Sequence, residues 1–187
     1  PASLQNTDVL VNILGDYIDA GADVITTNTY ASSRLRLGPA GHGDQFAEII
    51  GAATSAAVQA RQAGGRPGIL IAGCVSHSAA VVDGTSNPDQ ANAPTEAAMA
   101  DAFGELAMQL RDDGADLILL EMMFYPERMG PAFAAAVATG LPVWAGFSAR
   151  RGSNGQILSF APERDIPFAE IVAVLKDHEV AAAGIMH

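Results

Sequence analysis

Five polar side chains follow short apolar runs of the sequence, where they could meet a bound molecule. These candidate substrate-binding residues are Asn28, Thr29, Tyr30, Glu121 and Ser148. Hydroxyl and amide groups form hydrogen bonds, and a carboxylate can bind a cation. Glu121 directly ends an apolar run, where a buried carboxylate without a positive partner would be costly. We therefore expect Glu121 to bind a substrate ammonium group, the alternative being a structural ion pair with a loop arginine.

A cysteine and two histidines are candidates for metal binding or reactivity. Cys74 and His77 have the spacing Cys-x-x-His, which is one half of a possible metal site. A lone cysteine can equally be a small buried hydrophobe. His187 follows the last apolar run and could bind zinc through a ring nitrogen, or lie at a pocket rim without a metal. Arg150 and Arg151 could bind a carboxylate or remain solvated on a loop.

The spacing of apolar residues predicts helices and strands in alternation. Apolar side chains recur at helical spacing over residues 9–20, and we expect all of them on one buried face: Leu10, Ile13, Leu14, Tyr17 and Ile18. Strands are expected at 24–27, 68–73, 117–120, 143–147 and 181–186, and further helices begin near residues 46, 99, 128 and 168. The fourth helix should turn Met129, Phe133 and Val137 inward. The segment 74–94 is typical of a long active-site or mobile loop, and residues 148–165 of another loop.

Alternation of apolar strands with helices indicates an α/β fold with a parallel sheet, either open or closed into a barrel. No Gly-x-Gly-x-x-Gly follows a strand and no Walker-type loop is present, so the sequence favours a TIM-type (β/α)8 barrel. Five βα units make this an incomplete segment, because closure takes eight strands. We expect residues 1–187 to form a single barrel domain truncated at both ends, with its site at the carboxyl ends of the strands.

The composition limits which classes of partner the chain can bind. The chain has 21 acidic and 10 basic side chains, a net charge of −11. That balance argues against nucleic acid or an anionic membrane as a partner, since both require clustered Lys and Arg. The single cysteine, with no signal segment and no apolar run of about 18 residues, predicts a cytoplasmic protein. The oligomeric state stays open.

Four segments resemble the homocysteine-binding domain of the homocysteine S-methyltransferase family. The most specific is Asp16 to Tyr30, with the sequence DYIDAGADVITTNTY. The others are IAG at 71–73, GADLILLE at 114–121 and PVWAGFS at 142–148. The resemblance covers nearly the whole chain, as the second through sixth strands of that barrel.

The resemblance implies a reaction and a cofactor. In this family a zinc ion held by three cysteines binds homocysteine as a thiolate, which takes a methyl group from a sulfonium or ammonium donor and becomes methionine. Zinc stabilises the anion at a pH where a free thiol, with a pKa of about 8.5, is mostly protonated. This chain departs from the pattern at His187, which stands where the family has a cysteine, and at Cys74-Val-Ser-His77. We expect slow or absent methyl transfer, with His187 as a zinc ligand if a metal site survives.

Three functions remain in view. The first is a zinc-dependent methyltransferase acting on a small thiol amino acid with a methyl donor. The second is a divergent barrel that lacks the cysteine zinc site and binds an amino-acid-like ligand without methyl transfer. The third is another class of barrel enzyme that uses His187 and Glu121 as acid and base.

Overall fold

A parallel sheet of five strands organises the chain. The computed structural model describes residues 1–78, 92–161 and 163–186. The strands pair in the order β1-β2-β3-β4-β7, every pair parallel, and helices alternate with them along the chain. This confirms the α/β class and the predicted run of βα units from an incomplete TIM-type barrel. Within the described residues, no helix combines the length and apolar character needed to cross a membrane.

The elements have the following bounds. The parallel strands are β1 (Val24–Thr26), β2 (Leu70–Ser76), β3 (Leu117–Met123), β4 (Val143–Phe147) and β7 (Ala182–Ile185). The helices are α1 (Ala2–Gln5), α2 (Thr7–Asp19), α3 (Arg34–Leu37), α4 (Phe46–Ala63), α5 (Glu96–Asp112), α6 (Pro126–Ala138) and α7 (Phe168–Val172). Two 3₁₀ turns are η1 (Gly43–Gln45) and η2 (Ala173–Lys176), and a separate antiparallel hairpin joins β5 (Ala149–Arg151) to β6 (Ile157–Ser159).

Two helix-to-strand turns share the sequence Gly-Ala-Asp and the same geometry. Gly21 and Gly114 have φ of 102° and 107°, a conformation that a residue with a Cβ rarely adopts. The amides of Ala22 and Ala115 then donate to carbonyls five residues back, at 2.9 and 3.0 Å. A hydrogen bond to the carbonyl five residues back, next to a left-handed glycine, is the mark of a Schellman helix ending, and the chain enters β1 and β3 directly after it.

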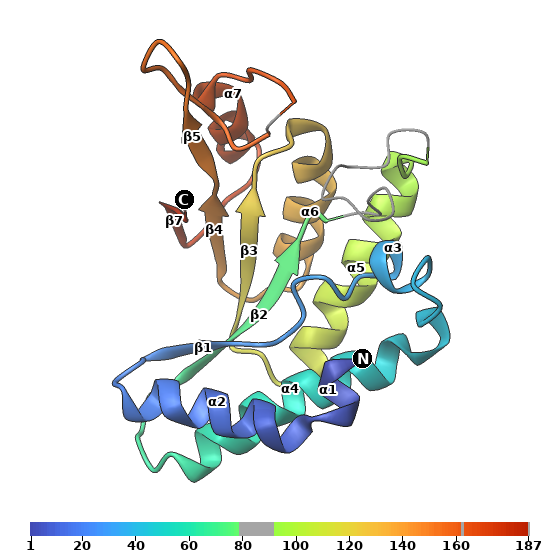
Figure 1. Ribbon diagram of the computed structural model, residues 1–187, viewed down its shortest axis with the longest axis vertical. Coiled ribbons are helices and arrows are strands. Elements are labelled where there is room, and N and C mark those ends of the chain that lie inside the picture. Colours follow the sequence, from blue (N-terminus) through green and yellow to red (C-terminus); the bar gives the residue numbers. More distant parts are fainter. Residues whose placement is uncertain (79–91, 162, 187) are drawn as a thin grey trace.

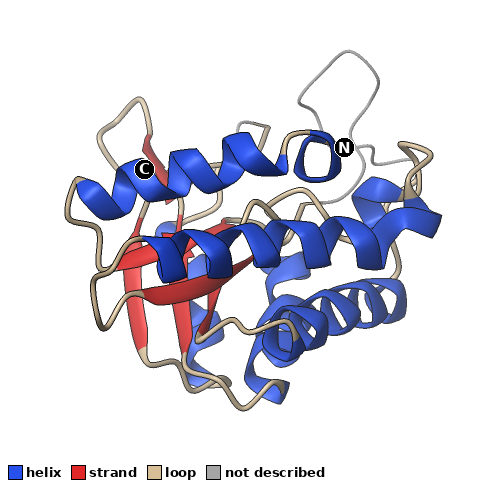
Figure 2. Ribbon diagram, turned by 90° about the horizontal axis from the view of Figure 1, so that it is seen from below, coloured by secondary structure: helices blue, strands red, loops and turns tan. Residues whose placement is uncertain are grey.

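The long helices lie on the outer side of the curved sheet (Figure 1), and the view from below meets α2 and α4 before the strands (Figure 2). Gly73 of β2 faces this helical layer, because a Cβ there would lie 3.1 and 3.2 Å from the Cβ atoms of Leu110 and Ala115. Side chains alternate along a strand, so Cys74 and Ser76 face the opposite, inner side. We call this side the inner face of the sheet.

Apolar side chains between the sheet and the helices form the core. Phe103 on α5, Phe133 on α6 and Phe147 on β4 are fully buried in its larger cluster. A smaller cluster lies under α2 and includes Leu14 and Ile18. These contacts fix the helices against the outer face and leave the inner face for other contacts.

Some details of the sequence analysis were wrong. Ile13 and Tyr17 of α2 are 47% and 61% exposed, so that apolar face is only partly buried. Val137 of α6 is 40% exposed, although Ala136 and Thr139 on either side of it are buried, so its side chain does not share their buried face. Strands β2 and β3 run to Ser76 and Met123, past their expected ends, and most of the expected 74–94 loop lies outside the described residues.

The hairpin of β5 and β6 was also missed, since residues 148–165 were expected to be a loop. Ala149–Arg151 pairs with Ile157–Ser159 around a turn in which the amide of Gly152 donates to the carbonyl of Gln156. Arg150 holds the segment after the hairpin through a 2.7 Å contact with Asp165. The Asn-Gly dipeptide at 154–155 was the available signal for a hairpin turn.

Candidate functional site

The end of β1 is joined to β2 by threonine hydroxyls. Thr27 Oγ1 accepts the amide of Cys74 at 3.0 Å, and Thr29 Oγ1 donates to the carbonyl of Cys74 at 2.7 Å. The two hydroxyl oxygens are 2.7 Å apart, and both threonines are buried. Ser76 Oγ adds a third link by donating to the carbonyl of Tyr30 at 2.6 Å. These bonds hold the segment after β1 against the inner face at the carboxyl end of β2.

Glu121 lies on the same inner face, one strand further along. The strand register pairs Ser76 with Glu121. Cys74 Sγ donates to Glu121 Oε2 at 2.5 Å, and this thiol is 1% exposed while Glu121 is half-buried. Among the described residues, Glu121 forms no ion pair with an arginine. The partner of its carboxylate among the described residues is therefore the Cys74 thiol.

The electrostatics of this cluster favour a protonated thiol. Burial raises the pKa of Cys74 well above its ordinary value, and the charge of Glu121 and the hydrogen bond to it raise this pKa further. Burial also raises the pKa of Tyr30, with additional contributions from Glu121 and Cys74 and an opposing one from Arg36. The Cys74 thiol and the Tyr30 phenol are thus both neutral at pH 7.

A strained residue follows Glu121. Met122 has φ of 55°, in the left-handed region that side chains disfavour, and a register shift between Leu120 and Met123 marks a β-bulge. Tyr30 Oη donates to Met122 Sδ at 3.4 Å, and the Met122 amide points at Met186 Sδ, also at 3.4 Å. Bulges of this kind re-aim side chains at functional edges of sheets.

An apolar groove of about 260 Å³ lies along the sheet at strands β3, β4 and β7. Its lining includes Leu119, Trp144, Gly146, Gly184 and Met186, from β3, β4 and the end of β7. Leu119 precedes Glu121 by two residues and so shares its face. A small molecule could place a charged group at Glu121 and an aliphatic portion in this groove.

The other predicted site residues have different surroundings. Asn28 is exposed and donates to Ser3 Oγ of α1 at 3.3 Å. Thr29 is fully buried and its hydroxyl is used between the strands. Ser148 is fully buried beneath the hairpin segment, where its carbonyl accepts the amide of Phe160. Tyr30 and Glu121 are thus the predicted residues that the structure brings together, and His187 lies outside the described residues.

Whereas the Cys74 thiol is bonded to Glu121, the side chain of His77 is buried and is bonded to the backbone. Its Nε2 accepts the amides of Phe124 and Tyr125, at 3.0 and 3.1 Å, ahead of α6. Burial lowers the pKa of His77 to about 3, and the positive charge of Arg128 contributes. With Nε2 used in this way and Cys74 bonded to Glu121, the Cys-x-x-His pair does not form half of a metal site here. No group of three or more potential metal ligands occurs among the described residues.

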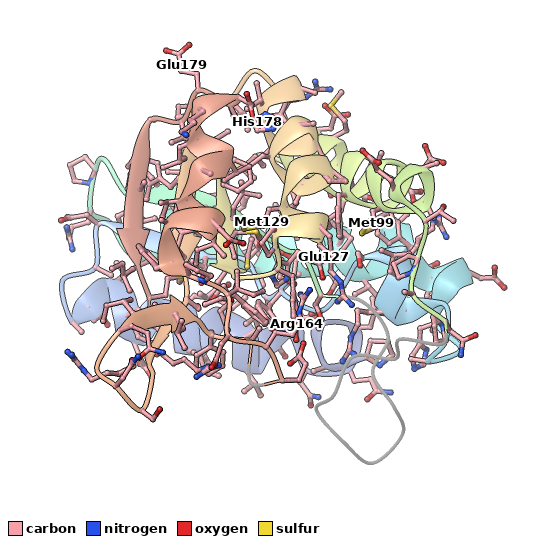
Figure 3. The ribbon with its side chains drawn as sticks, turned by 90° about the horizontal axis from the view of Figure 1, so that it is seen from above. Met99, Glu127, Met129, Arg164, His178 and Glu179 are labelled. Atoms are coloured by element: carbon pink, nitrogen blue, oxygen red, sulfur yellow. The ribbon has the colours of Figure 1, made fainter. Side chains whose placement is uncertain are left out.

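Ion pairs and a hydrogen bond join residues 163–165, which follow the β5–β6 hairpin, to the start of α6 and to the hairpin. Arg164 contacts Glu127 at 2.6 Å, and Figure 3 shows the two side chains extending toward each other. Tyr125 donates to Glu163 at 3.1 Å, and the guanidinium groups of Arg128 and Arg164 lie 4.9 and 5.3 Å from the Tyr125 ring centre. Arg150 is committed to the same segment through Asp165, so it does not extend a free cation toward Glu121.

Comparisons with known proteins point to one family. The homocysteine S-methyltransferase family model matches residues 1–185. Comparison with curated protein sequences gives no match. Among solved structures, the metallated form of the homocysteine methyltransferase MmuM from Escherichia coli is similar with a TM-score of 0.76 and 21% identity, covering 98% of this chain and 64% of that one. Its oxidized form gives a TM-score of 0.75 and 23% identity, covering 98% and 63%.

A more distant similarity involves another enzyme. The carboxyl transferase domain of Rhizobium etli pyruvate carboxylase, solved with pyruvate, has a TM-score of 0.54 and 15% identity, covering 96% of this chain and 24% of that one. At these identities the solved structures show a shared fold. The chain spans 64% of the length of the metallated MmuM chain.

Proposed function

The chain belongs to the homocysteine S-methyltransferase family, and on that premise we propose that it transfers a methyl group to the thiol of homocysteine or a similar small thiol amino acid. The proposed product with homocysteine is methionine, and the methyl donor is a sulfonium or quaternary ammonium compound. We retain the cytoplasm as the predicted location.

The observation that carries this proposal is the Glu121 carboxylate on the inner face. It lies beside Cys74 and Tyr30, its polar partner among the described residues is a neutral thiol, and Leu119 of the apolar groove precedes it by two residues on the same strand. An amino acid offers a cation for Glu121, which has no ion pair with an arginine among the described residues, together with a short aliphatic chain. We propose that Glu121 binds the substrate ammonium group and that Tyr30 lines the same pocket. We also propose Asn28, Thr29 and Ser148 as residues that line this pocket, of which Thr29 and Ser148 are fully buried.

Glu121→Gln tests this assignment, because it keeps the shape of the side chain and removes its charge. Homocysteine should bind about ten- to a hundred-fold more weakly, the range expected for a lost charged hydrogen bond. Glu48→Gln, an equal charge change at an exposed position on α4, is the matched control and should bind homocysteine like the wild type. Titration calorimetry measures both, and unchanged binding by Glu121→Gln would remove this residue from the site.

Methyl transfer is tested separately from binding. Methionine formation is measured with a sulfonium donor and, in a second assay, with a quaternary ammonium donor. Methionine formed with either donor supports the methyltransferase. Tight binding of homocysteine without methionine supports the second candidate, a ligand-binding barrel, which the replacement of a family cysteine by His187 favours.

Zinc is the cofactor that we propose from the family, and the existence of a metallated form of MmuM supports a metal. The described residues do not themselves fit a zinc ion, since Cys74 is a neutral thiol bonded to Glu121 and no cluster of ligands is present among them. Our prediction is therefore that His187 supplies a ligand. Zinc content measured by mass spectrometry should fall in His187→Ala relative to wild type and to His178→Ala, and equal content in all three would exclude His187.

A further inference from the structure

The Cys74 thiol is the hydrogen-bond donor that holds Glu121. Among the described residues, the carboxylate is bonded through Oε2 to Cys74 Sγ, and its other oxygen receives no donor. A side chain with several rotatable bonds and a half-exposed position would otherwise sample several rotamers. The 2.5 Å contact selects one of them, in which Oε1 is left for a ligand.

Cys74 is itself held at both ends of its backbone. Its amide donates to Thr27 Oγ1 and its carbonyl accepts from Thr29 Oγ1, so two buried hydroxyls from the end of β1 fix this one residue of β2. The contacts therefore run across three neighbouring strands, from the threonines through the cysteine to the glutamate. Each step is a hydrogen bond between buried or half-buried groups, where water does not compete.

We propose that Thr27, Thr29 and Cys74 form a positioning relay that orients Glu121 for the ammonium group of the substrate and thereby sets the preference for amino acids over ligands without an amino group. Cys74 is a positioning residue in this scheme, since it acts through Glu121 and does not contact the substrate. The proposal deepens the proposed function and rests on it. Preorganising the carboxylate strengthens binding because the rotamer is ordered before the ligand arrives.

The protonation of the thiol is consistent with this role. A thiolate at 2.5 Å from a carboxylate would repel it and could not donate. Burial and the adjacent Glu121 charge raise the pKa of Cys74 well above its ordinary value, so the proton stays on sulfur at pH 7. The same effect makes Cys74 a poor nucleophile, which favours a positioning role over a covalent one.

The test compares homocysteine with 4-mercaptobutanoate, which has the same thiol and carboxylate but no amino group. Wild type should prefer homocysteine. Cys74→Ala should weaken homocysteine binding about five- to ten-fold, as expected for one lost hydrogen bond, and leave 4-mercaptobutanoate unchanged. Cys74→Ser, which keeps a donor, should restore homocysteine affinity to within about two-fold of wild type.

A double-mutant cycle identifies the route of the effect. If Cys74 acts through Glu121, adding Cys74→Ala to Glu121→Gln should change homocysteine affinity no further. Equal losses for both ligands in Cys74→Ala would reveal a packing defect and overturn the relay, as would an unchanged ligand preference. If wild type shows no preference for homocysteine, the proposed function fails first and the relay has no substrate to orient.

A measurement without ligand tests the bond itself. The S–H stretching band in the infrared spectrum is assigned to Cys74 by its loss in Cys74→Ser. In Glu121→Leu, which has no acceptor, this band should move to higher frequency. An unmoved band would overturn the relay whatever the binding data show.

Discussion

His77 illustrates how a buried neutral histidine organises a backbone without entering the chemistry. Its Nε2 accepts the amides of Phe124 and Tyr125, the two residues that lead into α6. The ring packs on Phe124, with centres 4.6 Å apart. Protonation of Nε2 would break both hydrogen bonds and place a charge in the core beside Arg128.

Stability should therefore fall in mild acid. The pKa of His77 is about 3 in the folded protein, against an ordinary value of 6.5, so below pH 6.5 the unfolded chain binds a proton that the folded chain does not. This loss of stability is absent above pH 6.5 and amounts to about 2 kcal/mol by pH 5. Denaturant unfolding at pH 7 and pH 5 measures it.

The matched variants are His77→Gln, whose amide oxygen can accept the same N–H groups without titrating, and His42→Gln, which leaves His77 in place. His77→Gln should lose less stability between the two pH values than wild type, by about 2 kcal/mol. A loss as large in His77→Gln as in wild type would assign the acid sensitivity to other groups.

Strand β2 and helix α5 approach so closely that a single methyl group matters. A Cβ on Gly73 would lie 3.1 to 3.3 Å from atoms of Leu110 and Ala115, tighter than ordinary contact. Gly73→Ala should therefore destabilise the protein by about 1–3 kcal/mol through overpacking. Gly104→Ala, in the middle of α5 with nothing within 4 Å of the new Cβ, should instead stabilise by about 0.5–1 kcal/mol.

Thermal or denaturant unfolding of both variants distinguishes a packing effect from a general response to Gly→Ala. Opposite signs are expected for the two positions. Stabilisation by Gly73→Ala would mean that the sheet and α5 lie further apart than the structure shows.

Local sequence patterns predicted the elements but not the contacts between them. A left-handed helix ending such as those at Gly21 and Gly114 is encoded within a few residues, so it is a local feature of the sequence. The bond between Cys74 and Glu121 depends on the register of β2 and β3, which is set by packing over the full strand. The full burial of Ser148 could not be predicted, because residues 149–159 were expected to be part of a loop and they form a hairpin.

The two faces of the sheet differ in what lies against them. The outer face carries the helices and the buried phenylalanines, while the inner face presents Glu121, the groove and the strained bulge at Met122. The prediction that polar groups gather at the carboxyl ends of the strands followed from the βα alternation alone. The alternation does not predict which of these polar groups meet, since Asn28 and Thr29 are adjacent in sequence and have different surroundings.

The threonine links between β1 and β2 also have a consequence for the order of folding events. The bonds from Thr29 and Thr27 to Cys74 join residues 45 and 47 positions apart, so a long loop must close before they form. Thr29→Val, which removes the hydroxyl at nearly constant volume, should cost about 1–3 kcal/mol by leaving a buried carbonyl without its donor. Most of that cost should increase the unfolding rate and leave the refolding rate nearly unchanged.

Ala100→Gly on α5 provides the contrast, because it weakens a helix whose contacts are local. Stopped-flow refolding and unfolding rates for the two variants give the comparison. Refolding slowed as much by Thr29→Val as by Ala100→Gly would mean that β1 docks early. The expected result would mean that these threonine bonds form after the transition state for folding, so that they set the lifetime of the native state.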